Sequence, residues 1–390
     1  MHIGLVLPAP PAYSETFFQS KISGLLSAGH QVILFTGKAD PNFNLCPVVI
    51  GPGVTRNKVV QLAQMILSLV YVFFRAPRPT EKFYRLERES GRTFRQAIEN
   101  LYLNSHILIR KLDWLHFGFA TMSVRRENTA SAIGAKMAVS LRGYDISLYP
   151  LKNPGCYEFL WHKADKVHAI SDALIQKAYQ QGLSKAKSVV KITPAINSEL
   201  FKRSAPSPKP SNPLQLVTVA RLKWVKGLEY ILEALATLQK NGVDFHYKII
   251  GEGEEYERIC FAAHQLGIGE NVSFIGKLPH ADVKNAMEKA DIYLQYSLQE
   301  GFCNAVLEAQ AMGLLCIVSD AEGLPENVLH GQTGWVVPKR QPKLLANQIL
   351  EILEMPEEKR QVIKETAIER VRKDFNLEKQ KLEFLDFYNE

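Results

Sequence analysis

Apolar residues in this chain fall into short uninterrupted runs and into longer stretches in which they recur every three or four positions. A run such as 31–35 is typical of a buried strand, and a stretch such as 14–28, which stops before Gly29, predicts a helix. Strands that alternate with helices pair in parallel, so the pattern predicts an α/β fold with doubly wound sheets. The expected strands are 3–7, 31–35, 48–50, 112–117, 136–141, 166–170, 189–192, 216–219, 245–250, 272–275, 292–295, 316–319 and 335–337.

Two long helical stretches, 59–74 and 81–107, interrupt the alternation in the first half of the chain. A second interruption comes at 204–213, where four prolines fall within ten residues. Such a segment cannot be the interior of a helix and is typical of an extended connector. We therefore expect a first domain at 1–203, a linker at 204–213 and a second domain at 214–375. A last helix at 376–390 could pack back on the first domain.

Composition is typical of a large globular protein, since 46% of the 390 residues are apolar. The five cysteines form no paired CxxC spacing, which indicates neither a disulfide framework nor a zinc site and favours a reducing compartment. The first residues resemble a buried strand and not a signal peptide, so we expect a cytoplasmic protein. The longest apolar run, 65–74, is about half of the ~20 residues that a spanning helix needs, and no transmembrane helix is expected.

The formal charge of +7 is concentrated in 56–126, which holds 13 Lys or Arg against 5 Asp or Glu. Arg85, Arg88, Arg92 and Arg95 would form one positive face if this segment were a single helix. Three interpretations remain open: a solvated helix face, attraction to anionic lipid headgroups, and nucleic-acid binding. Nearby phenylalanines favour the membrane surface, which would place the protein peripherally on the inner face of the cell membrane. No nucleic-acid-binding motif is present.

The most informative stretch runs from Glu300 to Glu308, where a predicted strand turns into a helix. Backbone N–H groups in the first turn of a helix have no intrahelical acceptor and favour an anion. The carboxyl ends of strands in an open α/β sheet are also where ligands bind. We therefore expect a phosphate at the N–H groups between the two acids.

Two other segments end on the same expected edge. Arg221 and Lys226 follow the first strand of the second domain, where two cations can clamp a diphosphate. Gly251 and Gly253 follow the next strand, where missing side chains permit close approach. Each segment alone is equally compatible with solvated surface charge or an ordinary tight turn. Their conjunction with the glutamates predicts one site.

At these residues the chain resembles retaining, nucleotide-sugar-dependent glycosyltransferases of the family 4 type (glycosyl transferases group 1), which include bacterial exopolysaccharide and colanic-acid-type enzymes. The similarity is densest over 216–337. The matching motifs are Ala220-Arg-Leu, Lys226-Gly, Ile250-Gly-Glu-Gly, Phe274-Ile-Gly, Ala290-Asp-Ile-Tyr, the pair Glu300 and Glu308, Ser319-Asp, Gly323-Leu-Pro-Glu and Gly331-Gln-Thr-Gly. The resemblance implies the GT-B fold, in which two Rossmann-like doubly wound domains face each other across a cleft.

The resemblance also implies roles for residues of the second domain. Arg221 and Lys226 would bind the diphosphate of the donor, Glu308 the ribose hydroxyls, and Glu300 hydroxyls of the donor sugar. The backbone at Gly276, Lys277 and Leu278 would contact the base, and the amides of Gly301, Phe302, Cys303 and Asn304 would hold the phosphates. No Asp-x-Asp motif serves the diphosphate, so neither a metal nor another cofactor is expected.

The first domain resembles the family at fewer positions, all on the expected acceptor side. Its first loop carries Ser14, Glu15 and Thr16, as in the Ser-Glu-Thr-Phe variant of exopolysaccharide enzymes, but lacks the usual Gly-Gly pair. His116 matches a histidine that the family places over the donor sugar, with a buried core histidine as the alternative. Arg142, Tyr144 and Asp145 correspond to a loop that often reads His-Gly-x-Asp.

Together these features predict a metal-independent, retaining glycosyltransferase. It would move a hexosyl or N-acetylhexosaminyl group from a nucleoside-diphosphate sugar, with UDP favoured, to a lipid-linked or saccharide acceptor in the synthesis of bacterial surface polysaccharide or glycolipid. Two alternatives remain: a nucleotide-sugar 2-epimerase of the same fold, and a non-catalytic partner that binds sugar nucleotide or lipid.

Overall fold

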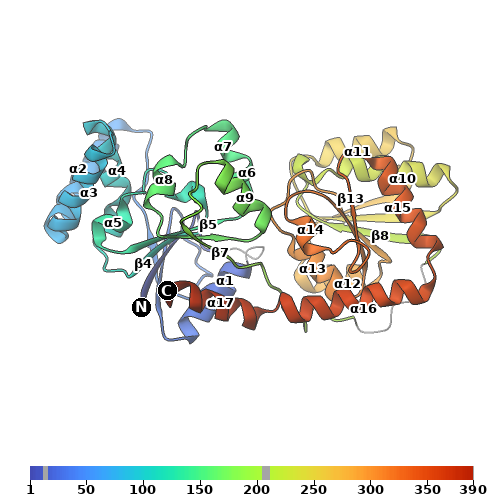
Figure 1. Cartoon of the computed structure of the whole chain (residues 1–390). Coiled ribbons are helices and arrows are strands. Elements are labelled where there is room, and N and C mark those ends of the chain that lie inside the picture. Colours follow the sequence, from blue (N-terminus) through green and yellow to red (C-terminus); the bar gives the residue numbers. More distant parts are fainter. Residues whose placement is uncertain (12–15, 204–210, 390) are drawn as a thin grey trace. The chain divides into compact units, whose positions relative to one another are not determined.

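The computed structural model of the chain describes residues 1–11, 16–203 and 211–389. It divides into two compact units (Figure 1). Unit 1 comprises Met1–Ile192 with Lys381–Glu390, and unit 2 comprises Thr193–Gln380. The first division therefore falls between Ile192 and Thr193, earlier in the chain than the predicted end of the first domain at residue 203. Most of the predicted linker, 204–210, lies outside the described residues.

Unit 1 contains a seven-stranded parallel sheet in the order β3-β2-β1-β4-β5-β6-β7. Its strands are β1 (His2–Val6), β2 (Gln31–Thr36), β3 (Val48–Ile50), β4 (Trp114–Phe117), β5 (Lys136–Leu141), β6 (Lys166–Ala169) and β7 (Ser188–Lys191). Ile3 is opposite Val32 on one side and Trp114 on the other. The chain thus reverses its direction of winding between β1 and β4, as a doubly wound sheet requires.

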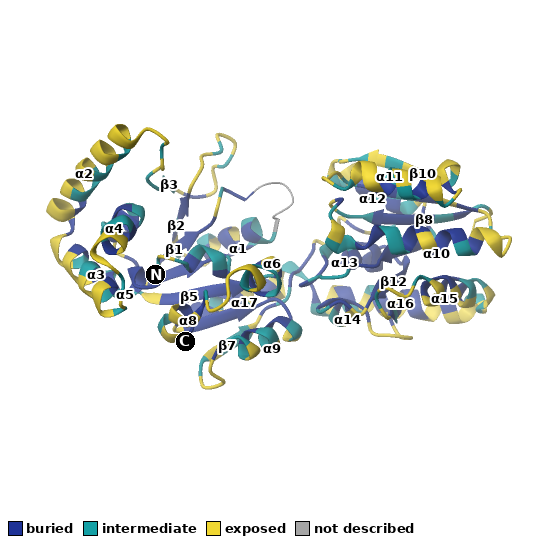
Figure 2. Cartoon of the chain, turned by 90° about the horizontal axis from the view of Figure 1, so that it is seen from above, coloured by how far each residue is buried: buried dark blue, intermediate teal, exposed yellow. Residues whose placement is uncertain are grey.

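Helices cover both faces of this sheet (Figures 1 and 2). They are α1 (Thr16–Ser27), α5 (Thr129–Ile133), α6 (Tyr144–Ser147), α7 (Tyr149–Lys152), α8 (Glu158–Lys163), α9 (Asp172–Gln180) and the 3₁₀ turn η2 (Ala120–Ser123). The end of α17 (Leu377–Asn389) also belongs to unit 1, where Phe387 and Tyr388 are buried against Trp114. The Trp114 indole Nε1 donates to the backbone oxygen of Tyr388 at 3.1 Å. A distant segment of sequence therefore completes the core of unit 1.

Three further helices of unit 1 are α2 (Lys58–Arg75), α3 (Pro77–Glu89) and α4 (Phe94–Leu108). The prediction of one helix over 81–107 is wrong, because the chain turns between α3 and α4. Gly91 has φ +78°, a left-handed conformation that a glycine adopts readily. Thr93 then caps α4 in a capping box, in which its hydroxyl accepts from the Gln96 amide and the Gln96 side chain accepts from the Thr93 amide.

The break removes the single arginine face that the sequence predicted. Arg92 lies in the turn and forms ion pairs with the buried carboxylates of Glu87 at 2.6 Å and Glu127 at 2.7 Å. Arg85 and Arg95 pair with acids one turn further along their own helices. Three of the four arginines of the predicted face are therefore paired with acids within unit 1.

Unit 2 contains a six-stranded parallel sheet in the order β10-β9-β8-β11-β12-β13. Its strands are β8 (Leu214–Val219), β9 (Phe245–Ile250), β10 (Val272–Gly276), β11 (Ile292–Gln295), β12 (Leu315–Ser319) and β13 (Trp335–Val337). Its helices are α10 (Leu228–Lys240), α11 (Tyr256–Gln265), α12 (His280–Glu288), α13 (Asn304–Ala311), α14 (Leu324–Asn327), α15 (Pro342–Glu354), α16 (Glu357–Asp374) and the 3₁₀ turns η3 (Trp224–Lys226) and η4 (Gly269–Asn271). The predicted α/β architecture with two doubly wound parallel sheets is confirmed.

Candidate functional site

The predicted donor residues gather where unit 2 reverses its direction of winding. Strand β8 lies beside β11, with Leu216 opposite Ile292. Both strands are parallel, so the segments that leave their carboxyl ends emerge at one edge of the sheet. One segment carries Arg221 and Lys226, and the other carries Glu300. A reversal point of this kind is the usual ligand site of an open α/β sheet.

Glycines allow these segments to approach one another closely. A Cβ on Gly251 would lie 1.9 Å from the backbone oxygen of Ala220, and one on Gly253 would lie 2.2 Å from that of Leu222. The Gly251 amide also donates to the backbone oxygen of Gly276 at 2.8 Å. The glycines thus serve first to pack the loops after β8, β9 and β10 together. The predicted base-contacting segment, Gly276 to Leu278, lies on the same edge as a result.

The central contact of the site is an ion pair between the Lys226 Nζ and the Glu300 Oε2. Glu300 Oε2 also accepts a hydrogen bond from the Ser297 hydroxyl at 3.1 Å. Both charged side chains are only 14% exposed. Burial alone lowers the pKa of Lys226, but the Glu300 carboxylate outweighs burial and raises that pKa above the ordinary lysine value. Lys226 is therefore held as a cation at the edge of the sheet.

A second loop fixes the backbone of Glu300. The Glu300 amide donates to the Glu322 carboxylate at 2.9 Å, and the Gly323 amide donates to the Glu300 backbone oxygen at 3.0 Å. A Cβ on Gly323 would lie 1.9 Å from the Gly301 oxygen, so only glycine fits this contact. The loop after β12 therefore supports the loop after β11.

The amides at the start of α13 are partly committed to the protein itself. The Cys303 amide donates to Asn327 Oδ1 at 3.0 Å, and the Asn327 side chain donates back to the Cys303 oxygen at 3.1 Å. Cys303 is thus not available as the phosphate donor that the sequence suggested. Within the described part of the chain, the amides of Gly301, Phe302 and Asn304 have no acceptor. These three amides remain the candidates for donating hydrogen bonds to a bound anion.

Glu308 lies in α13 and is 8% exposed. Burial raises the pKa of its carboxyl to about 7. The described residues offer this carboxylate no hydrogen bond or ion pair. A nearly buried carboxylate without a protein partner is costly unless a ligand supplies the hydrogen bonds, so Glu308 is a candidate ligand contact. Arg221, in contrast, is exposed at the end of β8.

His116 does not reach the surface, and its predicted contact with donor sugar is not supported. The ring is 0% exposed. One ring nitrogen is 2.6 Å from the Tyr388 hydroxyl and the other is 2.8 Å from the Ser140 hydroxyl. Burial lowers the pKa of His116, with a further contribution from Lys21. The alternative of a satisfied core histidine therefore describes its position, because α17 covers the end of β4.

The predicted acceptor-side loop is also stabilised from within. Asp145 is 1% exposed and accepts hydrogen bonds from the amides of Ala120, Arg142 and Gly143. Its carboxylate thus shapes the loop and is not exposed to an acceptor. The Arg142 guanidinium lies 3.8 Å from the ring centre of Phe17, and Tyr144 is exposed. Ser14 and Glu15 lie outside the described residues, and of Thr16 only its place at the start of α1 is described.

Sequence reasoning missed four residues that build or support these surroundings. Ser297, Glu322 and Asn327 hold the loops around Glu300 and Cys303, and Lys21 lies 3.2 Å from the His116 ring. The segment 323–326 was identified as a motif, and its two neighbours Glu322 and Asn327 could have been found from it. Lys21 gave no signal, since nothing in a helix sequence shows that a lysine will be buried. Among the described residues, no group of three or more His, Cys, Asp or Glu side chains is arranged to hold a metal ion.

A known family model matches one part of the chain, which lies within unit 2. Residues 201–370 match the family model described as Glycosyl transferases group 1. The chain is 29% identical over 269 residues to the putative colanic acid biosynthesis glycosyltransferase WcaL of Escherichia coli (67% of this chain, 66% of the relative). It is 26% identical over 363 residues to the amylovoran biosynthesis glycosyltransferase AmsK of Erwinia amylovora (88% of each chain). The matched part thus spans just under two thirds of WcaL.

Solved structures support the same fold over the whole chain. A sucrose-phosphate synthase from Thermosynechococcus elongatus superposes with a TM-score of 0.72 and 20% identity, covering 100% of this chain and 98% of that one. HepE of Anabaena, in complex with UDP and glucose, superposes with a TM-score of 0.72 and 18% identity, covering 100% and 99%. Identities this low show the fold alone. The chain therefore has the GT-B fold, and its residues 201–370 form a domain of the glycosyl transferases group 1 family.

Proposed function

We propose that the protein transfers a sugar from a nucleoside-diphosphate donor to a hydroxyl of an acceptor in the synthesis of a bacterial surface polysaccharide or glycolipid. The observation that carries this proposal is the arrangement at the reversal point of unit 2. There the Lys226–Glu300 pair, the free amides at the start of α13 and the unpartnered carboxylate of Glu308 occupy one edge. The relatives' names, which refer to colanic acid and amylovoran, support the polysaccharide setting.

Each group has a place in the proposed chemistry. As the bond to the donor sugar breaks, negative charge develops on the leaving diphosphate. Cations and N–H groups already fixed around that charge lower the barrier. Lys226 and Arg221 would neutralise the phosphates, and the amides of Gly301, Phe302 and Asn304 would donate to their oxygens. Glu300 both orients Lys226 and supplies an acceptor for a sugar hydroxyl.

Glu308 would recognise the nucleoside. Its carboxylate accepts hydrogen bonds from the two ribose hydroxyls, which provide the partners that the protein does not. We favour UDP as the nucleotide, since structures of HepE contain UDP and UDP-glucose on a similar fold. Because protein cations neutralise the diphosphate in this scheme, we propose that no metal ion is required. Retention of anomeric configuration is likewise proposed from the family resemblance.

The test is donor binding and turnover with matched variants. Lys226→Ala should reduce transfer, or the slower hydrolysis of UDP-sugar, by about two to three orders of magnitude, as when a charge-stabilising donor is removed. Lys240→Ala, at the exposed far end of α10, is the control and should behave as wild type. Activity of Lys226→Ala close to wild type would refute the phosphate role. Unchanged activity in excess EDTA is expected, and an epimer formed from donor alone would instead identify an epimerase.

We also propose that unit 1 rests on a membrane surface, through α2 and not through the predicted arginine face. Exposed apolar residues cover the outward side of α2 (Figure 2). They are Val59, Val60, Ile66, Leu67, Val70, Tyr71, Phe73 and Phe74. Basic residues flank both ends of the helix: Arg56 and Lys58 at its start, Arg75 and Arg78 at its end. An apolar face with flanking cations suits the interface of an anionic bilayer.

By length and composition, α2 is also the one helix among the described residues that could cross a membrane, contrary to the expectation from the run 65–74. Such a single helix is weak evidence for a span. α2 is attached to its neighbours in unit 1, since the Ser68 hydroxyl donates to the Ser105 hydroxyl of α4 at 2.9 Å and the Thr80 hydroxyl of α3 donates to the Val72 oxygen at 3.3 Å. A helix held in this way along its side lies on the surface of unit 1 instead.

A further inference from the structure

Unit 1 has a pocket of about 270 Å³ at the carboxyl ends of β1, β2 and β3. The strand ends contribute Leu7, Pro8, Thr36, Gly37, Gly51 and Pro52, among other residues. The remaining wall comes from Leu103 and His106 of α4 and from Met122 and Arg126. The pocket therefore occupies the edge of unit 1 that corresponds to the donor edge of unit 2. Arg142, Tyr144 and Asp145, the residues predicted for acceptor contact whose side chains the structure describes, do not line it.

Within the part of the chain that the structure describes, two buried polar atoms of the lining side chains have no hydrogen-bond partner. They are Nε of Arg126 and Nδ1 of His106. Among the described residues, the Arg126 side chain makes one hydrogen bond, from Nη1 to the Met122 oxygen at 3.2 Å. Unsatisfied buried polar atoms are rare, because each forfeits its hydrogen bond to water. Two of them in one pocket indicate that a ligand completes the site.

The charge around this pocket favours an anion. Burial lowers the pKa of Arg126, and neighbouring Arg125 lowers it further, while Glu127 opposes both. Glu127 is itself committed to Arg92. Burial, together with Arg126 and Arg110, lowers the pKa of His106 to about 4. At neutral pH, His106 is therefore uncharged and able to donate one N–H, beside a guanidinium whose charge is poorly balanced.

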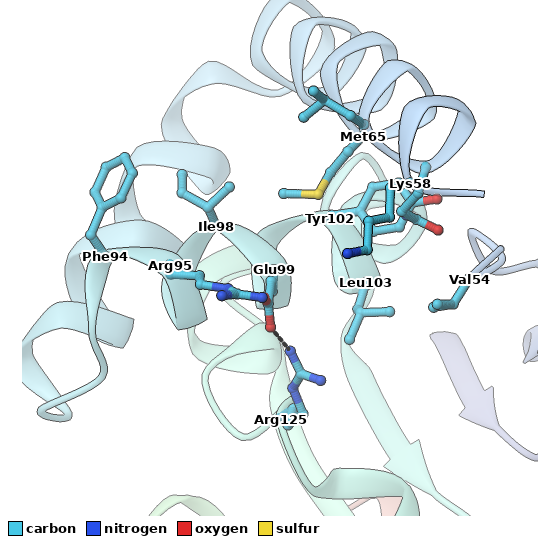
Figure 3. Close-up of a pocket in the computed structure, with 12 residues that line it drawn as sticks. Val54, Lys58, Met65, Phe94, Arg95, Ile98, Glu99, Tyr102, Leu103 and Arg125 are labelled. Carbon is cyan, nitrogen blue, oxygen red and sulfur yellow. Dashed lines mark hydrogen bonds and ion pairs between the residues drawn. The ribbon is translucent and has the colours of Figure 1, made fainter. Parts of the chain in front are cut away.

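A larger apolar cavity of about 550 Å³ lies next to this pocket, between α2 and α4 (Figure 3). Its apolar lining includes Val54, Leu62, Met65, Phe94, Ile98 and Leu103. The two spaces are neighbours, because Leu103 lines both and because the successive residues Arg125 and Arg126 line one each. Met65 of α2 points toward Ile98 and Tyr102 of α4 across the cavity (Figure 3).

From these neighbouring spaces we propose that unit 1 binds a phosphate-bearing lipid, with the phosphate at Arg126 and His106 and the hydrocarbon chain in the cavity between α2 and α4. This rests on the proposed function and specifies its acceptor as a lipid-linked phosphate. An amphiphile of this kind matches a cationic pocket with an apolar cavity beside it, whereas a free saccharide would leave the cavity empty. The apolar outer face of α2 places the cavity at the surface from which such a lipid would come.

Binding of dodecyl phosphate to the full chain, measured by calorimetry below its micelle concentration, tests this inference. Dodecanol matches only the apolar cavity and inorganic phosphate matches only the cationic pocket. Both should therefore bind more weakly than dodecyl phosphate. Arg126→Gln should weaken dodecyl phosphate binding by about tenfold to a hundredfold, the value of a charge-assisted hydrogen bond. Arg126→Lys should recover part of the affinity.

The chain part of the site is tested by a pair of variants on one helix. Leu62→Trp should fill the cavity and weaken binding, whereas Val60→Trp, on α2 but outside the cavity lining, should not. UDP binding by the same variants should be unchanged, because the donor site lies in unit 2. Thermal unfolding of each variant that matches wild type shows that unit 1 is folded. Failure of wild type to bind dodecyl phosphate, equal binding of inorganic phosphate, or an Arg126→Gln affinity equal to wild type would overturn the inference. Failure of the wild-type protein to bind UDP would refute the proposed donor site. It would not affect the conclusion about lipid binding, which dodecyl phosphate tests separately.

Discussion

Replacing Glu308 by glutamine should make the stability of unit 2 less dependent on pH. Burial raises the pKa of this carboxyl from its ordinary 4.5 to about 7, so the folded state binds the proton more tightly than the unfolded state. The contribution of Glu308 to wild-type stability is therefore fully present below pH 4.5 and is lost as pH rises from 4.5 through about 7. At roughly 1.4 kcal/mol per pKa unit, the loss amounts to about 3 kcal/mol. Glutamine carries no charge and avoids that loss.

The assay is thermal unfolding of both proteins at pH 5 and pH 8. The gain from Glu308→Gln should be small at pH 5 and reach roughly 6–12 °C at pH 8 for a unit of this size. Glu233→Gln, on the exposed side of α10, should show no such difference. A gain that is the same at both pH values would refute the claim that a buried charge is what destabilises the site.

The same carboxyl links ligand binding to protons. Ribose hydroxyls that donate to Glu308 stabilise its charged form and lower its pKa, so UDP binding near pH 6.5 should release a proton. Calorimetry in buffers of different ionisation enthalpy measures that proton directly. Glu308→Gln should bind UDP more weakly and release none, and equal proton release by the variant would contradict ribose contact.

Two further predictions concern unit 1. Arg92→Ala should destabilise unit 1 by about 3–5 kcal/mol, because the buried Glu87 and Glu127 carboxylates would lose their shared cation. Denaturant unfolding measures this change in the free energy of unfolding. A loss below about 1 kcal/mol would contradict the buried pairing. Vesicle binding should rise with anionic lipid content and fall with salt. It should weaken in Leu67→Asp but not in Val362→Asp, an exposed apolar site on α16, and equal binding to neutral vesicles would refute the membrane role of α2.

The fold was predictable because its signal is repeated along the whole chain. Most of the short apolar runs are strands whose residues are largely buried, and the order of strands and helices determines parallel pairing. The break between α3 and α4 was missed although Gly91 and the capping box at Thr93 mark it. The regular spacing of the arginines favoured a single continuous helix, but Gly91 interrupts that helix.

The site was predictable only as a set of segments on one edge. Sequence placed Lys226, Glu300 and Glu308 together, because strand ends in a parallel sheet must meet. It could not show that Asn327 occupies the Cys303 amide, since that depends on how the loop after β12 folds. Sequence could not choose between the two interpretations of His116 for a similar reason, as its cover comes from α17, far away in the chain. Contacts made by distant segments leave no local pattern.

The position of α17 has a consequence for the order in which the protein can mature on the ribosome. Phe387 accepts a hydrogen bond from Lys166, and Tyr388 contacts both Trp114 and His116 inside unit 1. These residues are translated after every residue of unit 2. Unit 2 can therefore fold as soon as it emerges from the ribosome. Unit 1 is made first, but its apolar face stays exposed until Phe387 and Tyr388 have been synthesised. That waiting period is when the nascent chain would most need a chaperone.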